Sequence, residues 1–161
     1  MELELRDYRN TEIKEVLPIW NEVVEEGGSF PFTDFFDEES LGRLLDHEVQ
    51  ARVVCADGRV VAMYVMAANL PGRCSSIANA TYLVKKEYRG MHIGEMMVKD
   101  SLKEAKAYGF RMMQFNGVVD SNIHARHLYE RCGFHEVGVI PKGFRVKDGH
   151  YEDMHIMLNV F

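Results

Sequence analysis

The sequence predicts an α/β domain of the α+β type, in which helices flank a mixed, mostly antiparallel central sheet. Asp57-Gly58 stands between two apolar, β-branched runs, which is a strong signal for an antiparallel hairpin. The β-rich run from Ile77 to Val84 is followed by a turn and a helical pattern, so the next strand should pair with it in parallel. The element order is β-α-α-β-β-β-α-β-α-β-β, without linker or repeat, and one domain is expected over residues 1–161.

The first elements are a short strand and two amphipathic helices. Leu3, Leu5 and Tyr8 alternate as in a strand, and Asn10 or Thr11 can cap the helix that follows. A proline at position 18 should kink or break that helix, and Gly27-Gly28 should end it. Its expected buried stripe consists of apolar residues at helical spacing: Ile13, Val16, Leu17, Trp20, Val23 and Val24. A second helix should start near Glu38 and bury Leu41, Leu44 and Leu45.

An aromatic loop, residues 29–33, joins these two helices and carries Phe30 and Phe32. It can be a hydrophobic lid on the core or one wall of a pocket for a substrate, and the sequence leaves both interpretations open.

The remaining elements follow from periodicity and turn residues. Strands are expected at 51–56, 60–67, 77–84, 111–118, 136–140 and 154–159. A helix should begin at Glu95 and end before Gly109, which suits the left-handed position after a helix. Another helix should run from about Asn122 to Cys132, with turns at 69–73 and 147–150.

Composition and charge exclude several classes of protein. The net charge of −6 argues against a nucleic-acid partner, which usually meets a basic face. The charged N-terminus is not a signal peptide, and no apolar run has transmembrane length, so no membrane association is expected. Three widely spaced cysteines, Cys55, Cys74 and Cys132, indicate reduced thiols and a cytoplasmic location.

The segment from Tyr88 to Gly94 is a basic turn with two glycines between a strand and a helix. The first N–H groups of a helix lack intrahelical partners and carry partial positive charge, so this arrangement suits a phosphate group. The P-loop pattern and the G-x-G-x-x-G pattern are both absent. From the residues alone, the turn is either a phosphate site or an ordinary basic loop.

Val84 followed by Tyr88-Arg89-Gly90-Met91-His92-Ile93-Gly94 resembles the pyrophosphate-binding signature of the GNAT superfamily of acyl-CoA N-acyltransferases. The resemblance implies the GNAT fold and acetyl-CoA as co-substrate, held by the backbone amides of this turn. His92 stands where the family pattern has its central glycine, and we expect it to adopt a helical conformation with its side chain away from the phosphates. The implied cofactor-binding residues here are Leu83, Val84, Arg89, Gly90, Met91, His92, Ile93 and Gly94.

The helix expected after Asn122 carries a second motif. Ala125, Leu128, Tyr129 and Cys132 share one face, so Tyr129 read alone is a core residue whose hydroxyl finds one partner. The segment 122–134 also resembles the GNAT pattern N-x-x-A-x-x-L-Y-x-x-x-G-F. The resemblance implies that Asn122, Ala125, Leu128 and Tyr129 bind the cofactor, with Asn122 at the pantetheine arm and Tyr129 placed to protonate the leaving thiolate.

Segments 77–82, 114–119 and 140–145 are similar to those of small bacterial GNAT proteins that resemble amino-acid and phosphinothricin acetyltransferases. This similarity implies N-acetylation of a primary amine of a small molecule. We assign to the acceptor side Glu25, Phe30, Phe32 and Phe144. Glu22, Glu25 and Glu26 of the first helix could face the acceptor and supply the general base, or they could belong to a solvated helical face.

Direct attack of an amine on a thioester has three chemical requirements. The amine must lose a proton, the oxyanion needs a donor, and the thiolate gains from an acid. We expect the donor to be a backbone N–H near Leu83 or Val84, at a bulge in the strand. Because this strand carries no acid, a water relay through Asn79 or Asn116 is the preferred route for the amine proton. The three catalytic candidates are therefore Tyr129, Asn79 and Asn116.

Two other functions stay open at this stage. The chain could be a CoA-binding sensor or partner module without turnover, or it could transfer a longer acyl group through a roomier channel around Met96, Met97 and Leu128. His124, His127, Cys132 and His135 lack the spacing of a zinc site, so no metal is expected. An exposed C-terminal strand, 156–161, would favour a homodimer by pairing across an edge.

Overall fold

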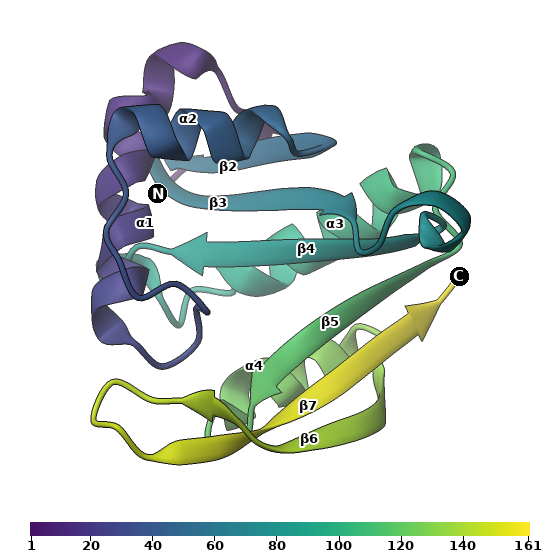
Figure 1. Cartoon of the computed structure of the whole chain (residues 1–161). Coiled ribbons are helices and arrows are strands. Elements are labelled where there is room, and N and C mark those ends of the chain that lie inside the picture. The colour runs from purple at the N-terminus through teal and green to yellow at the C-terminus, as the bar shows by residue number, and fades with distance from the viewer.

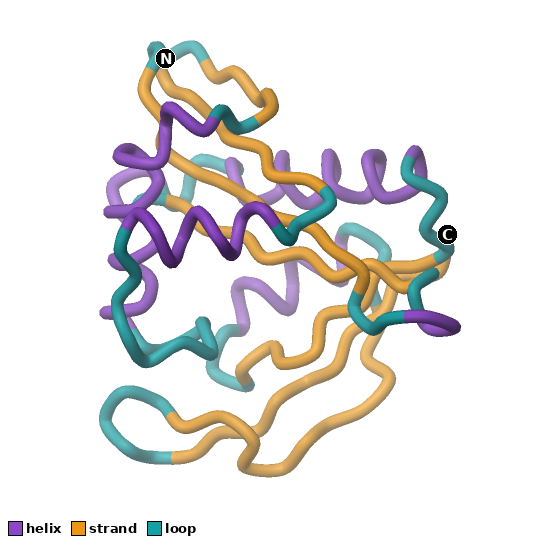
Figure 2. The backbone as a smooth tube through the Cα atoms, turned by 45° about the horizontal axis from the view of Figure 1, so that its top comes forward, coloured by secondary structure: helices purple, strands orange, loops and turns teal.

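A computed structural model describes residues 1–161 and shows one seven-stranded sheet with helices on both faces (Figures 1 and 2). The elements in chain order are β1 (Leu3–Asp7), α1 (Ile13–Glu26), α2 (Glu38–Asp46), β2 (Gln50–Ala56), β3 (Arg59–Ala68), β4 (Ile77–Val84), α3 (Ile93–Ala107), β5 (Met112–Val119), α4 (Ile123–Arg131), β6 (His135–Arg145) and β7 (Tyr151–Val160). The predicted element order is confirmed.

The sheet has the strand order β1-β2-β3-β4-β5-β7-β6, and every neighbouring pair is antiparallel except β4 with β5. Asp57 and Gly58 both have positive φ, 49° and 82°, as a tight hairpin between β2 and β3 requires. The mixed, mostly antiparallel sheet predicted from the sequence is confirmed.

Strands β4 and β5 pair over only two positions, Ile77 with Met112 and Ala78 with Met113. Beyond these positions they diverge, and Figure 1 shows the gap opening between β4 and β5. The sheet is therefore divided into an N-terminal half, β1 to β4, and a C-terminal half, β5 to β7.

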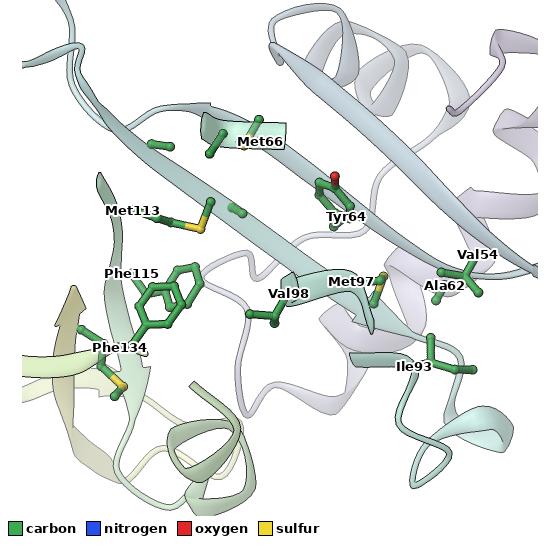
Figure 3. Close-up of a cluster of buried hydrophobic side chains, with 14 of the residues drawn as sticks. Val54, Ala62, Tyr64, Met66, Ile93, Met97, Val98, Met113, Phe115 and Phe134 are labelled. Atoms are coloured by element: carbon green, nitrogen blue, oxygen red, sulfur yellow. The ribbon is translucent and has the colours of Figure 1, made fainter. Parts of the chain in front are cut away.

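Each face of the sheet has its own hydrophobic core. One core packs α3 and α4 against alternate strand residues, including Tyr64, Met113 and Phe115 (Figure 3). The other packs α1 and α2 against the intervening residues, with Trp20 fully buried at its centre. Along β4, Ala78 and Ala80 face α3, whereas Leu83 belongs to the α1 side, as the period of two in a strand dictates.

Helix α1 runs unbroken through Pro18 and ends at Gly27, which adopts the left-handed conformation with φ 63°. The expected caps Asn10 and Thr11 lie in a short 3₁₀ turn, Asn10–Glu12, and neither side chain caps α1. Helix α2 begins at Glu38 as predicted, because the Asp37 carboxylate accepts the Ser40 N–H.

The C-terminal hairpin differs from the prediction in two respects. Strands β6 and β7 are longer than expected, because β6 stays paired through two irregularities, one of them at the Pro141-Lys142-Gly143 segment. The expected edge strand 156–161 is wrong: β7 lies between β5 and β6, so β6 is the edge. None of the helices combines the length and apolar character needed to cross a lipid bilayer.

Candidate active site between the parted strands

The turn before α3 has the features of an anion site. Helix α3 starts at Ile93, two residues earlier than predicted, and no side chain caps its N-terminus. The Met96 N–H makes a 3.1 Å bond to the His92 carbonyl, so the N–H groups of Ile93, Gly94 and Glu95 have no partner within the helix. Backbone donors and helix dipole therefore converge just after Gly90.

His92 does not adopt the helical conformation that the sequence analysis expected. Its φ of 62° and ψ of 16° lie in the left-handed region, where a glycine is normally favoured. Its side chain is 85% exposed and stands 3.7 Å from Glu95. The backbone shape that glycine would provide is thus formed by histidine, with the imidazole in solvent.

Arg89 in the same turn is engaged by α1, a contact that the sequence analysis missed. Its guanidinium forms a two-pronged ion pair with Glu26 and donates from Nε to the Val84 carbonyl at 3.1 Å. The Glu22 carboxylate accepts the Lys86 N–H. The resemblance named Arg89, but nothing local in the sequence indicates its partner on α1.

Beyond Ala78, the inner edge of β4 faces the gap without a partner strand. The Lys85 N–H donates to the Val61 carbonyl, and the Asn69 N–H donates to the Ile77 carbonyl. The N–H and C=O groups of the odd-numbered residues of β4 therefore face β3. Even-numbered residues, Val84 among them, consequently point theirs toward β5, from which β4 has separated.

This geometry corrects two expectations. Strand β4 pairs with β3 in unbroken register through Val84, so the bulge expected there is absent. Leu83 has its N–H in the β3 ladder and its side chain in the α1 core, and of the two predicted donors only Val84 faces the gap. The irregularity lies instead in β5, between Phe115 and Val118.

Tyr129 of α4 lies among aromatic rings near the gap. Its ring centroid is 4.4 Å from that of Phe115, 5.7 Å from Phe134 and 6.4 Å from Tyr82. Its hydroxyl has no hydrogen-bond partner in the protein, and burial raises the pKa of Tyr129 to about 12. Tyr129 is therefore a neutral donor without an internal acceptor.

Helix α4 lies against the start of α3. A Cβ added to Gly94 would stand 3.6 Å from Leu128, so a larger residue would contact α4 there. Asn122 caps α4 by accepting the Ala125 N–H at 3.3 Å, which leaves its amide nitrogen free to donate. The second motif, Asn122 to Tyr129, is thus brought beside the anion site.

Four amide side chains meet where β4 and β5 part. Asn69 Oδ1 accepts from Asn79 at 3.3 Å and from Asn116 at 2.6 Å, and Asn116 Oδ1 accepts from Gln114 at 2.9 Å. The two asparagines named from sequence are therefore adjacent, joined by Asn69, which sequence analysis did not single out.

The α1–α2 loop borders a cavity of about 360 Å³, lined by Pro31, Phe32, Thr33, Asp34, Phe35, Phe36 and Ser40. Phe30 is buried in the core, with its ring centroid 5.1 Å from that of Trp20, whereas Phe32 lines the cavity. Phe30 therefore fits the interpretation of a hydrophobic lid on the core, and the role of Phe32 in a substrate pocket stays a prediction. Phe144 is buried in β6.

The Glu25 carboxylate forms an ion pair with Lys147 Nζ of the β6–β7 loop at 3.0 Å. The backbone N–H of Lys147 also donates to the Gly27 carbonyl. This contact joins the two halves of the molecule across the open end of the gap, where both views show the loops adjacent (Figures 1 and 2). It also occupies the Glu25 carboxylate.

His155 of β7 is a buried group that the sequence analysis missed. Its Nε2 is 2.7 Å from Asp120, and its Nδ1 contacts Glu136. These carboxylates, Asp120 above all, raise the pKa of His155. The imidazolium therefore ties β6 and β7 to the junction that leads into α4. No cluster of three or more potential metal ligands is present in the structure.

The site combines an uncapped helix N-terminus, a geometry that suits a phosphate group, with two strands that part beside it. The family model of the Acetyltransferase (GNAT) family matches residues 13–134. This match spans most of the chain, so the protein belongs to the GNAT family.

Individual relatives agree with this membership. N-acetyltransferase aca1 of Schizosaccharomyces pombe is 39% identical over 90 residues, which are 55% of this chain and 43% of that protein. The chain thus matches less than half the length of this curated relative. The structure of a GCN5-related N-acetyltransferase from Kribbella flavida superposes with a TM-score of 0.92 at 28% identity, covering 99% and 98% of the two chains.

A phosphinothricin acetyltransferase from Sinorhizobium meliloti, solved in complex with AcCoA, has a TM-score of 0.93 at 18% identity, with 100% and 89% coverage. At this identity the likeness concerns the fold.

Proposed function

We propose that the protein is an acetyl-CoA-dependent N-acetyltransferase that modifies a primary amine of a small molecule by direct attack. The observation that carries the proposal is the convergence of an uncapped α3 N-terminus, the unpaired inner edge of β4 and the Tyr129 hydroxyl around one gap. A thioester cofactor needs these three groups at its pyrophosphate, its carbonyl and its sulfur.

The reaction forms a bond between the amine nitrogen and the acetyl carbonyl carbon, and it breaks the bond from that carbon to sulfur. The Val84 N–H is the donor that would stabilise the tetrahedral oxyanion, because it faces the gap. The products are an amide and the CoA thiol.

Tyr129 acts in this proposal as a hydrogen-bond donor to the departing thiolate. With a pKa of about 12, it would lose free energy by giving its proton completely to a thiolate whose conjugate acid has a pKa of roughly 8.5. A hydrogen bond stabilises the developing charge without that transfer, and the thiolate then takes up, through solvent, the proton that the amine nitrogen loses once it has attacked.

The amine proton leaves through water held by the amide cluster of Asn69, Asn79 and Asn116. An alkyl ammonium has a pKa of roughly 10 and must be deprotonated before it attacks. No carboxylate belongs to the cluster, so its oxygen atoms can orient a water but cannot hold the proton, which passes through that water to bulk solvent.

The acceptor would enter from the side of the α1–α2 loop. The cavity beside Phe32 and Phe36 has a volume suited to a small molecule, and Asp34 in its lining favours a cationic amine. The net charge of −6 acts in the same direction.

Calorimetric titration with acetyl-CoA, CoA and desulfo-CoA tests the first half of the proposal. Micromolar binding supports the phosphate role of the turn, and absence of binding removes it. Thiol release over a panel of small amines tests the second half, since a CoA sensor without turnover would bind acetyl-CoA but release no thiol, whichever amine is offered.

A further inference from the structure

We propose that Glu26 and Glu22 of α1 position the turn before α3, residues 86–94, through their contacts with Arg89 and Lys86, which we call the clamp. In this proposal Arg89 is a positioning residue and not a ligand of the pyrophosphate. The inference rests on the proposed function, because it assigns a role at the acetyl-CoA site. It concerns two carboxylates that neither the family pattern nor the sequence analysis assigned to the cofactor.

The bonds of Arg89 already define its orientation. Nη1 donates to Glu26 at 2.7 Å, Nη2 donates to the other oxygen of the same carboxylate, and Nε donates to the Val84 carbonyl at 3.1 Å. A planar guanidinium held at these three points has a fixed position. The side chain is 38% exposed, so it lies at the surface of the site.

The bond to Val84 links the clamp to catalysis. Val84 is the last residue of β4, and its backbone is the one that faces the gap. Arg89 therefore fixes the residue that would supply the oxyanion donor as well as the turn that would hold the pyrophosphate.

Glu22 holds the other end of the turn. Its carboxylate accepts the Lys86 N–H at 2.6 Å and lies 3.9 Å from Arg89 Nη2. Glu22 and Glu26 are four residues apart in α1 and therefore share one face of the helix. Two successive turns of α1 thus fasten the segment from Lys86 to Arg89.

The charges of the clamp argue for a positioning role. Two carboxylates beside an anion site oppose binding of a pyrophosphate through Coulomb repulsion. Glu26 also stands at the C-terminus of α1, where the helix dipole disfavours a negative charge and favours the Arg89 cation. Because Glu26 neutralises Arg89, binding of phosphate would depend on the backbone amides of the turn.

This arrangement gives opposite predictions for one substitution. Glu26→Gln removes a negative charge and releases Arg89, so it should tighten acetyl-CoA binding if Arg89 is a phosphate ligand. If the clamp positions the turn, the same change should weaken binding, despite the more favourable charge.

The experiment measures the dissociation constant and the KM of acetyl-CoA for the wild type, E26Q, R89M, R89K and the double variant E26Q/R89M. Glu39→Gln is the matched control, since Glu39 is also an exposed glutamate paired with an arginine, Arg43, at 2.7 Å. Thermal melting of every variant separates loss of folding from loss of affinity.

We expect E26Q to raise both constants about fivefold, the upper range for an exposed ion pair. R89K should be no better than R89M, because lysine cannot reproduce the fork. The double variant should be no weaker than R89M alone, and E39Q should match wild type.

Three results would overturn the inference: tighter or unchanged binding in E26Q, full rescue by R89K, or additive losses in the double variant. If the wild type binds acetyl-CoA and any of these appears, the positioning role alone is wrong. If the wild type does not bind acetyl-CoA, the proposed function is wrong and the positioning role falls with it.

Discussion

Replacement of Tyr129 by phenylalanine isolates the one hydroxyl in the gap that has no partner in the protein. The ring contacts with Phe115, Phe134 and Tyr82 remain in Y129F, and no intramolecular hydrogen bond is lost. The free energy of unfolding should therefore change by less than about 0.5 kcal/mol.

The expected loss of activity follows from the role of a hydrogen bond to a charged group. Such a bond contributes about 1.5–3 kcal/mol, which corresponds to a fall in kcat of roughly 10- to 150-fold. Full proton transfer would give a larger effect, but the pKa of about 12 makes Tyr129 a weak acid toward a thiolate. The same raised pKa keeps the hydroxyl protonated, so the pH profiles of wild type and Y129F should run parallel between about pH 6 and 10.

The assay is steady-state release of the CoA thiol, followed with a chromogenic disulfide reagent at saturating acetyl-CoA. Tyr64→Phe is the control, because the Tyr64 hydroxyl donates to Asp100 at 2.7 Å, within the core on the α3 face of the sheet. Y64F should lose stability and keep kcat, whereas Y129F should do the reverse. A Y129F enzyme with kcat within twofold of wild type would refute the role of the hydroxyl.

Three further predictions concern other parts of the structure. Gly27→Ala should destabilise the fold by more than about 2 kcal/mol in urea unfolding, because its φ is 63° and an added Cβ would stand 2.6 Å from Lys147 Cβ. Gly28→Ala is the control, because an added Cβ there would have no atom within 4 Å, and equal effects of the two changes would contradict the close approach at Gly27. Because Asp120 and Glu136 raise the pKa of His155 above 6.5, its contribution to stability should be complete below about pH 6.5 and lost as the pH rises through the raised folded value. The difference in unfolding free energy between wild type and H155Q should therefore shrink at alkaline pH, and a constant difference would show that His155 does not titrate in this way. Replacing Asn79 and Asn116 together by alanine should lower kcat about 100-fold and shift the pH profile, and unchanged turnover with an unchanged profile would remove the water relay.

Local features of the fold were predictable because their causes lie within a few residues. The strand Ile77–Val84 was assigned to its observed ends, since a β-branched apolar run is bounded by turn residues on both sides. Gly109, with φ 91°, ends α3 as the sequence indicated, and Asp57-Gly58 forms the hairpin. The long hairpin of β6 and β7 was underestimated, because Pro141 and Gly143 have the local character of a loop, whereas β6 pairs with β7 on both sides of the irregularity that they form.

The site was predictable in its motifs and not in its contacts. Both helices beside the gap were predicted, α3 with a start two residues too late and α4 with a start within one residue of the observed one. The catalytic roles of Tyr129, Asn79 and Asn116 stay predictions. The choice between Leu83 and Val84 depended on which edge of β4 each backbone faces, and this parity is set by the register with β3. A shift of one residue would exchange them, and no local pattern reports that register.

By itself, the sequence determined the order of the elements, the polarity of their faces and the turn that precedes α3, because propensity, periodicity and turn chemistry act over short distances. Only the tertiary structure decided which side chains meet: Arg89 with Glu26, Asn79 and Asn116 with Asn69, and His155 with Asp120 and Glu136. It also decided that β6 forms the edge of the sheet. The physical reason is that these partners are distant in sequence. Their meeting depends on how the whole sheet closes, and the free energy that selects it is distributed over both cores.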